Sequence, residues 1–263
     1  MERQRLGKWL LVIACVSGPG APAARATDLC GTTVIDHVKL SQDLVCSGDG
    51  LIVGANGIRI DLNGFSIQGS GTGAGVVVNG YDDVTIAGGA IRQFAVGIRV
   101  ATSTELVIRQ IEFVANAEGI DFQAGSIHNT VKDSAFRLSS TRAIMLRGNS
   151  KENDIKANTF ADNRVGILVF GGVDNSIKNN FIAGSTLAGI RVNVIATGTV
   201  IKDNIITSNA AGVEFLVTPT GSAIGNELKG NTIGANACGL KGTTAGNEIH
   251  DNLFESNTTD TCP

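Results

Sequence analysis

The sequence predicts an all-β fold, a single-stranded right-handed parallel β-helix, which is a solenoid of about nine rungs. Three observations predict it. A phrase of glycine, apolar residue, any residue and apolar residue recurs every 22 to 24 residues between Gly75 and Gly212. Apolar and polar residues alternate in the phrase as in a β-strand, and no stretch of the mature chain sustains a helical pattern with caps. Aromatic residues make up only 5% of the chain, against 34 glycines, which suits thin stacked layers of small and branched side chains.

Each repeat unit contains two recognisable phrases. Copies of the first begin at Gly57, Gly75, Gly97, Gly119, Ala143, Gly166, Gly189, Gly212 and, in degenerate form, Gly239. The second, apolar–Lys–any–Asn–any–apolar, has good copies at 155–160, 201–206 and 228–233. Two or three short strands per unit, with Gly and Asn at the corners, indicate a coil of parallel strands. A leucine-rich repeat has the same period, but Leu is sparse at the repeat positions and no helical segment faces each strand.

Alignment of the units predicts columns of equivalent residues. One inward column holds Phe113, Phe136, Phe160, Ile182, Ile206, Ile233 and Phe254. Two further columns hold asparagines: Asn158, Asn180, Asn204, Asn231 and Asn252 in one, and Asn116, Asn163, Asn209, Asn236 and Asn257 in the other. Asn tolerates the left-handed conformation of a corner, and its amide can bond to the same residue on the next rung, about 4.8 Å away. We therefore interpret these asparagines as structural rather than as ligands of a sugar.

Residues 1–26 have the pattern of a secretory signal peptide. A basic segment with Arg3, Arg5 and Lys8 precedes a short apolar run at 9–16, and Ala24-Arg25-Ala26 follows as a cleavage site. The apolar run is too short to span a bilayer. The pattern predicts a secreted, periplasmic or cell-surface protein that begins at Thr27. As an alternative, residues 12–15 loosely resemble a lipoprotein processing box, which would place a lipid anchor at Cys15.

The mature chain is expected to have an N-terminal capping segment at 27–56, followed by β-helix repeats at 57–263 with a disulfide-tied C-terminal end. Cleavage leaves four cysteines, and an even number in an oxidising compartment favours disulfides. The expected pairs are local, Cys30–Cys46 and Cys238–Cys262. The alternative, a metal site, is disfavoured by the wide spacings and by the lack of a nearby histidine in the sequence.

The charge of the mature chain disfavours nucleic acid as a partner. Removal of residues 1–26 leaves 17 basic and 23 acidic residues, a net charge of −6. General nucleic-acid binding depends on an excess of positive charge. The sequence therefore predicts an exported protein that does not bind nucleic acid and has no membrane span.

The stretch 30–69 carries a resemblance to a known class of proteins. It reads CGTTVIDHVKLSQDLVCSGDGLIVGANGIRIDLNGFSIQG and resembles the opening of secreted bacterial right-handed parallel β-helix repeat proteins, with a pectate-lyase-like scaffold. The chain also resembles the periplasmic copper-binding protein of nitrous-oxide reductase maturation and the mannuronan C5-epimerases. The resemblance implies a scaffold, and the activities of such proteins span lyases, hydrolases, epimerases and proteins with no known reaction.

A polysaccharide lyase or epimerase is one function that the sequence suggests. Polysaccharide-cleaving relatives use an outward strand face, where the middle residues of the first phrase include Arg99 and Asp121, with Arg147 nearby. We take these three as candidate catalytic residues, because a lyase needs a cation that stabilises the uronate carboxylate and a base. The alternative is that Arg99–Asp121 and Arg191–Glu214 are ion pairs between rungs.

No cofactor is expected. Calcium-dependent lyases gather three or more acidic ligands from adjacent rungs, and Asp121 with Glu118 is too few, so Ca²⁺ is possible but unsupported by an acidic cluster. The histidines His37, His128 and His250 belong to different rungs or to the cap. A copper-binding role therefore has no visible ligands in the sequence.

The second phrase yields a column of outward cations. Arg109, Lys132, Lys156, Lys178, Lys202 and Lys229 occupy equivalent positions of successive units, and His250 follows them. A row of cations at the spacing of one rung can follow an acidic polysaccharide. The alternative is a solubilising edge, because Lys blunts strand pairing and nearby acidic residues neutralise it.

Two features remain open at the level of the sequence. Met145, Leu168, Phe170 and Leu216 are expected to form an outward apolar patch, which suggests self-association or a sugar platform. The long segment 217–225 is the candidate to cover it, or to form a groove wall. The leading hypothesis is an exported protein that binds or acts on an extracellular, acidic polysaccharide. A lyase or epimerase and a non-catalytic structural protein of the surface or envelope are the alternatives.

Overall fold

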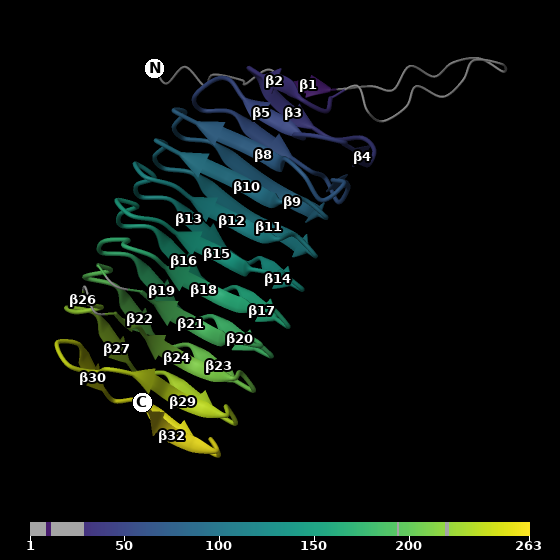
Figure 1. Ribbon diagram of the computed structural model, residues 1–263. Coiled ribbons are helices and arrows are strands. Elements are labelled where there is room, and N and C mark those ends of the chain that lie inside the picture. Colours follow the sequence, from purple (N-terminus) through teal and green to yellow (C-terminus); the bar gives the residue numbers. More distant parts are fainter. Residues whose placement is uncertain (1–8, 12–28, 194, 219–220) are drawn as a thin grey trace, which may run out of the picture.

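The chain folds into one elongated solenoid of β-strands (Figure 1). The computed structural model describes residues 9–11, 29–193, 195–218 and 221–263. In these residues the secondary structure is entirely β, and none of them forms a helix that could cross a membrane. The all-β parallel β-helix predicted from the repeat is confirmed. The predicted cleavage site at 24–26 and Cys15 lie outside the described residues.

One side of the solenoid, here called the first face, is an eleven-stranded parallel sheet with one strand per turn. Its strands are β2 (Thr32–Val34), β5 (Leu51–Val53), β8 (Ala74–Asn79), β10 (Val96–Ala101), β12 (Glu118–Phe122), β15 (Arg142–Leu146), β18 (Val165–Val169), β21 (Ala188–Val192), β24 (Ala211–Phe215), β29 (Cys238–Gly242) and β32 (Thr259–Cys262). They carry the first phrase of the repeat from Gly75 onward.

A nineteen-stranded parallel sheet forms the other two sides and bends at a corner between them. The second face contains β3 (His37–Lys39), β6 (Arg59–Asp61), β13 (Thr130–Lys132), β16 (Asp154–Lys156), β19 (Ser176–Lys178), β22 (Val200–Lys202), β27 (Glu227–Lys229) and β30 (Glu248–His250). The third contains β4 (Leu44–Val45), β7 (Ser66–Gln68), β14 (Ala135–Arg137), β17 (Thr159–Ala161), β20 (Phe181–Ala183), β23 (Ile205–Thr207), β28 (Thr232–Gly234) and β31 (Leu253–Glu255). The long strands β9 (Thr85–Arg92) and β11 (Val107–Val114) run through the corner and belong to both faces.

The N-terminal turns differ from the alignment expected from the sequence. Arg59 was expected in the same column as Arg99, but Arg59 pairs with Thr85 on the second face. The strand Leu51–Val53 occupies the first face in that turn, where Ile52 pairs with Val77. The expectation was wrong because alternating apolar residues look alike on every face of the solenoid. Strand β1 (Trp9–Leu11), within the predicted signal peptide, pairs with β3.

The core is a set of columns that run along the solenoid. Phe113, Phe136 and Phe160 are fully buried and stack, with ring centroids 4.5 and 4.8 Å apart and planes within 7° of parallel. The column continues through aliphatic residues in the same register, as predicted. The glycine of the first phrase is required by close approach: a Cβ on Gly119 would lie 2.4 Å from the carbonyl oxygen of Ala143 and 2.8 Å from Phe136 Cδ1.

The predicted asparagine columns are hydrogen-bonded ladders inside the corners. Asn158 Nδ2 donates to Asn180 Oδ1 at 3.1 Å, and Asn180 Nδ2 donates to Asn204 Oδ1 at 3.0 Å. Each of these amides also donates to a backbone carbonyl; for example, Asn180 Nδ2 donates to the carbonyl of Ile155 at 2.9 Å. The structural interpretation of these asparagines is therefore confirmed. A further ladder, not predicted, contains Asn129, Asn153, Asn175, Asn226 and Asn247.

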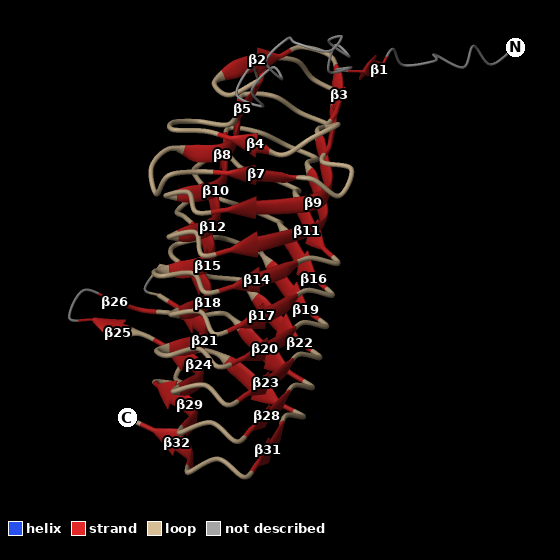
Figure 2. Cartoon of the chain, turned by 90° about the vertical axis from the view of Figure 1, so that its right-hand side faces the viewer, coloured by secondary structure: helices blue, strands red, loops and turns tan. Residues whose placement is uncertain are grey.

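Both predicted disulfides are present, Cys30–Cys46 near the beginning of the solenoid and Cys238–Cys262 near its end. Disulfides persist in oxidising compartments, so they indicate a location outside the cytoplasm. A short antiparallel hairpin, β25 (Val217–Thr218) with β26 (Gly221–Ser222), interrupts the regular turns after β24 and projects from the solenoid (Figure 2).

Candidate functional site

A straight row of cations runs along the second face. The parallel register pairs Arg109 with Lys132, and then each lysine with the next one. We call this row the cation stripe; it consists of Arg109, Lys132, Lys156, Lys178, Lys202 and Lys229. His250 continues it in register with Lys229. Neighbouring strands lie about 4.8 Å apart, so the stripe places one positive charge on each of six successive turns at that spacing.

A second outward column accompanies the stripe two residues earlier on each strand. It contains Val107, Thr130, Asp154, Ser176, Val200 and Glu227. Residues i and i+2 of a strand lie on the same face, so these side chains form a floor beside the cations. From β11 to β22 the side chains of this floor are valine, threonine and serine, apart from Asp154.

Asp154 is the acidic residue that binds two members of the stripe. Its Oδ2 lies 2.6 Å from Lys156 Nζ, and its Oδ1 lies 3.1 Å from Lys178 Nζ on the next turn. Burial alone would raise the pKa of Asp154, but the hydrogen bonds from the two lysines and their charges outweigh it and lower the pKa below its ordinary value. The carboxylate therefore offsets one of the two positive charges.

The other cations differ in how strongly they are neutralised. Arg109 bonds to Gln110 rather than to a carboxylate, and Lys132 forms no ion pair within the described part of the chain. Lys202 lies 3.6 Å from Asp203, and both side chains are about half exposed. Acidic residues gather at the end of the stripe nearest the C-terminus; they are Asp203, Glu227, Glu248 and Asp251. The unneutralised positive charge therefore lies on the turns of Arg109 to Lys178.

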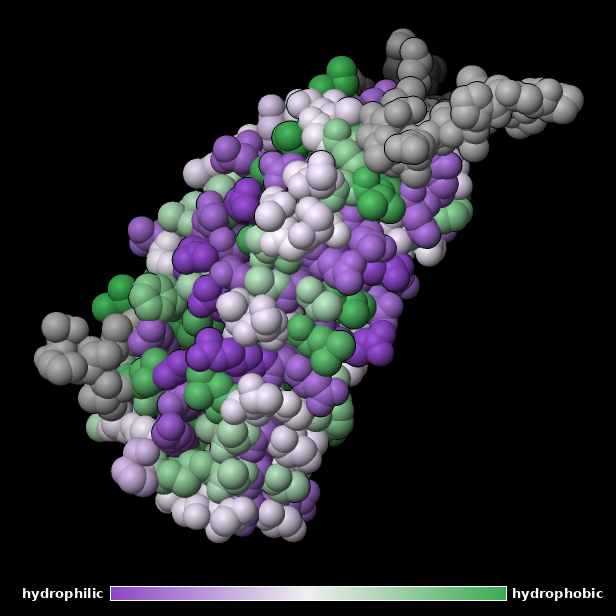
Figure 3. All heavy atoms as spheres, turned by 45° about the vertical axis from the view of Figure 1, so that its right-hand side comes forward, coloured by the Kyte–Doolittle hydropathy of each residue, from purple (hydrophilic) through white to green (hydrophobic). Residues whose placement is uncertain are grey.

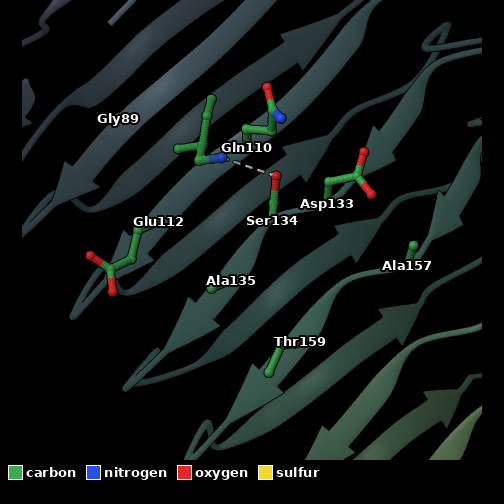
Figure 4. A pocket seen from close by; sticks show the side chains of 9 residues that line it. Gly89, Gln110, Glu112, Asp133, Ser134, Ala135, Ala157 and Thr159 are labelled. Atoms are coloured by element: carbon green, nitrogen blue, oxygen red, sulfur yellow. Dashed lines mark hydrogen bonds between the residues drawn. The ribbon is translucent and has the colours of Figure 1, made fainter. Parts of the chain in front are cut away.

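A shallow groove of about 490 Å³ follows the corner next to the stripe (Figure 4). It is bordered by Gln110, Asp133 and Ala157, which directly follow stripe residues, and on the third face by Glu112, Ala135 and Thr159. Ser134 lies on its floor and accepts a hydrogen bond from the backbone N–H of Ile111 at 3.2 Å. Two acidic residues line the groove: Glu112, which is paired with Arg137, and the exposed Asp133, so an anion is favoured over the stripe rather than in the groove.

The first face carries the residues predicted for catalysis, and two of the three are in contact. Arg147 Nε lies 2.6 Å from Asp121 Oδ1, and Gln123 Nε2 donates to Asp121 Oδ2 at 3.0 Å. Arg99 pairs in register with Asp121, but no ion pair joins them among the residues described. The expected Arg99–Asp121 ion pair is therefore replaced by one with Arg147, which lies on the following turn, two residues past the partner of Asp121 in the sheet.

This cluster is held together by ion pairs among its own members. The Asp121 side chain is only 3% exposed, and the Arg142 guanidinium lies 2.6 Å from Glu118. The hydrogen bond to Asp121 raises the pKa of Arg147 above its ordinary value, against the opposing effect of burial. Both carboxylate oxygens of Asp121 are engaged and its side chain is nearly buried, so it is placed to orient Arg147 rather than to act as a general base.

A second charged group lies farther along the first face. Arg191 and Lys241 approach Glu214 from the two adjacent turns at 2.8 and 3.3 Å, which confirms the expected Arg191–Glu214 pair. The group borders an open hollow of about 660 Å³, lined also by Leu216 and Thr243. The hollow holds one net positive charge from these three side chains.

The apolar patch expected between these groups is mostly covered. Met145 and Leu168 are 3% and 8% exposed because Val165 and Leu187 pack over them. Of the four residues proposed for self-association, Phe170 is the one that exposes a large part of its side chain, 43%. Figure 3 shows hydrophobic groups scattered among hydrophilic ones on the side it presents. The hairpin expected to cover the patch projects outward instead (Figure 2).

The histidines do not converge. His37 Nδ1 accepts the backbone N–H of Arg59 at 2.9 Å, His128 pairs with Glu152, and His250 lies 3.2 Å from Glu227. Within residues 29–193, 195–218 and 221–263, no three His, Cys, Asp or Glu side chains are placed to hold a metal ion.

The role of Asp154 is the feature of this surface that sequence reasoning undervalued. The sequence marks Asp154 as one of several acidic residues near the lysines, but not as a bridge between two of them. Two signals identify it: the spacing of two residues to Lys156, which puts both on one face, and the repeat period to Lys178.

Comparison with known proteins identifies a family and a fold. A family model described as "Periplasmic copper-binding protein (NosD)" matches residues 47–225 and 149–261. A search of curated proteins finds no match.

Several solved structures have the same architecture. An alginate lyase from Paenibacillus sp. is 18% identical with a TM-score of 0.67, over 85% of this chain and 92% of the lyase. The periplasmic alginate epimerase AlgG is 14% identical with a TM-score of 0.66, over 83% of this chain and 72% of the epimerase. A tailspike variant of E. coli bacteriophage HK620, bound to a pentasaccharide, is 12% identical with a TM-score of 0.57, over 89% of this chain and 56% of the tailspike. At these identities the likeness shows the fold alone.

Proposed function

The chain belongs to the NosD family of parallel β-helix proteins, and from this premise we propose that it binds an acidic polysaccharide along the cation stripe, outside the cytoplasm. The observation that carries the proposal is the register: six cations stand on six consecutive turns of one face. A linear polyanion parallel to the solenoid axis meets them in succession. Many weak contacts then add to a useful affinity.

The solubilising-edge alternative is weakened by the pairing of the strands. Lysines blunt aggregation where a strand has an unpaired edge. Strands β13, β16, β19 and β22 are each paired on both sides, so their lysines protect no edge. A continuous row of cations in a chain of net charge −3 calls for another explanation, and attraction of an anionic ligand supplies one.

The residues described do not fit the copper that the family description implies. Copper is held by imidazole, thiolate or thioether groups. The three histidines are separated and engaged with other partners, all four cysteines of the solenoid form disulfides, and Met145 is buried. The proposed function therefore involves no copper.

The structural neighbours support the choice of ligand class in a limited way. The lyase and the epimerase act, by their names, on alginate, which is an acidic polysaccharide. Their likeness to this chain is one of fold, so the ligand class proposed here depends on the stripe itself.

Binding to alginate or pectate, measured by calorimetry or affinity electrophoresis at low and high salt, tests the proposal. We expect retention by both polymers, loss of retention at high salt, and none by a neutral glucan. The double variant Lys132→Glu and Lys178→Glu should lower the affinity about tenfold or more. Lys151→Glu with Arg164→Glu, which reverses two exposed cations off the stripe, should change it little. Equal losses in both double variants, or salt-independent binding, would contradict the proposal.

The runner-up function is a lyase or epimerase, supported by the contact of Arg147 with Asp121 on the first face. A lyase releases an unsaturated product that absorbs in the near ultraviolet, and an epimerase changes the polymer NMR spectrum without cleavage. Either signal, if abolished by Asp121→Asn while binding persists, would establish catalysis on the first face. Absence of both signals across polyuronates, with and without Ca²⁺, would leave binding as the activity.

A further inference from the structure

Resting on the proposed function, we infer that the stripe selects a linear polymer with one carboxylate on every sugar, a homopolyuronate, and holds about four consecutive sugars over the turns of Arg109 to Lys178. The inference depends on two further observations: the uneven charge along the stripe and the regular spacing of its cations.

The charge along the stripe divides it into two segments of opposite sign. The first contains Arg109, Lys132, Lys156 and Lys178, with Asp133 and Asp154 beside them, which leaves a net charge of +2. The second covers the turns of Lys202, Lys229 and His250, where Asp203, Glu227, Glu248 and Asp251 lie beside two lysines, so the formal charge is −2 when the histidine is left out of the count. A polyanion is attracted by the first segment and repelled by the second. The bound length is therefore about four turns.

The spacing of the cations sets the charge pattern that the ligand needs. One turn advances the stripe by about 4.8 Å, and one sugar in an extended chain advances it by about the same distance. A homopolyuronate therefore presents a carboxylate to each cation. A polymer with one carboxylate on every second sugar matches every second cation, and the others stand opposite uncharged sugars. At a separation near the Debye length of about 10 Å, the unmatched charges contribute little.

The surroundings of the first segment suit a sugar chain that lies flat. The floor beside Lys132 and Lys178 carries the hydroxyls of Thr130 and Ser176, which can bond to sugar hydroxyls. The corner groove on the other side is lined by Asp133, which repels carboxylates, and by Glu112, whose charge is offset by Arg137. The ligand is thus confined to the second face, with its carboxylates toward the lysines.

Calorimetry with oligosaccharides of defined length tests the inference. Oligouronates of two to eight sugars should gain affinity steeply up to four or five sugars and little beyond. An oligouronate of four sugars should bind about fivefold or more tightly than a hyaluronan-type octasaccharide, which carries the same four carboxylates on alternate sugars. Lys132→Glu with Lys178→Glu should remove the difference, and Lys202→Glu with Lys229→Glu should leave it intact.

The outcomes separate the inference from the proposal on which it rests. Equal affinities for the two ligands, or affinity that rises steadily to eight sugars, would overturn the inference while polysaccharide binding stands. Failure of long alginate and pectate chains to bind at low salt would overturn both.

Discussion

Asp154 Oδ2 lies 2.6 Å from Lys156 Nζ, on the same strand and the same face of the solenoid. The other oxygen of Asp154 reaches Lys178 on the next turn at 3.1 Å. One carboxylate thus keeps two cations of the stripe at neighbouring positions and offsets one of their charges. The residue sets how much positive charge the stripe offers to an anionic ligand.

Replacement of Asp154 by Asn should therefore strengthen polyuronate binding. The change removes a negative charge from the centre of the positive segment, and we expect a two- to fivefold gain in affinity at low salt that disappears at high salt (about 1 kcal/mol or less). The free energy of unfolding should fall by less than about 1 kcal/mol, because the ion pairs are partly exposed. Calorimetric titration checks the first value and urea unfolding the second; weaker binding in D154N would contradict this account of the stripe.

Acid should destabilise the N-terminal turns through Asp43. Its Oδ1 accepts hydrogen bonds from the backbone N–H and the hydroxyl of Ser66 at 2.7 and 2.9 Å, and these bonds lower the pKa of Asp43. A lowered pKa means that the carboxylate stabilises the fold above its unfolded pKa, and that this contribution is lost as the pH falls through the folded value. Asp43→Ala should cost about 1 kcal/mol at neutral pH, and the cost should shrink as the pH falls below the ordinary pKa of an aspartate. Urea unfolding from neutral to acidic pH measures this, with Glu105→Ala as a control; a cost that does not change with pH would point to a different cause.

Loss of one asparagine from a corner ladder should strongly lower the free energy of unfolding. Asn180→Ala removes the acceptor of the Asn158 N–H and the side-chain donor to the carbonyl of Ile155 in a buried place, while Asn204 Oδ1 keeps the backbone N–H of residue 180. We expect a loss of about 3 kcal/mol in the free energy of unfolding. Asn180→Ser should cost about half as much, because Ser134 occupies the equivalent position of another turn and accepts a backbone N–H. Equal costs for Ala and Ser would show that the ladder contributes through shape alone.

A methyl group at the glycine of the repeat should be poorly tolerated. In Gly119→Ala the new Cβ would lie 2.4 Å from the carbonyl oxygen of Ala143, so strand β12 or β15 has to shift. We expect a loss of 1–3 kcal/mol, roughly the cost of overpacking a core. Gly64→Ala is a matched control for glycine loss, since nothing lies within 4 Å of its Cβ, although its positive φ of 84° adds strain of its own. Thermal unfolding of both variants shows whether contact or backbone strain dominates.

Much of the fold could be predicted because equivalent residues of successive turns have the same surroundings, so each turn gives the same information again. The phenylalanine column and the two asparagine ladders follow from the repeat period, and the disulfides follow from the even number of cysteines in an exported chain. Arg59 was misplaced because alternation is the same on all three faces, and only the register identifies the face.

The site was less predictable because side-chain contacts between turns depend on reach and on covering residues. The repeat period aligns Arg99 with Asp121, but the ion pair with Asp121 is formed by Arg147, which lies outside that column. The repeat period also places Met145 and Leu168 on the outward side of their strands, yet the neighbouring Val165 and Leu187 cover them. The row of lysines was predictable, since it needs only register. Its division into segments of opposite charge needs the positions of the acidic neighbours as well.

The most direct test of the stripe is to map where a bound oligouronate touches the protein. An oligouronate that carries a single succinimidyl ester, with its other carboxylates left free, couples to lysines that it meets, and mass spectrometry of the peptides locates them. Coupling should concentrate on Lys132, Lys156 and Lys178, exceed that of an uncharged ester at those lysines, and be suppressed by free alginate. Coupling confined to Lys241 on the first face, or spread evenly over the exposed lysines, would contradict polysaccharide binding along the stripe.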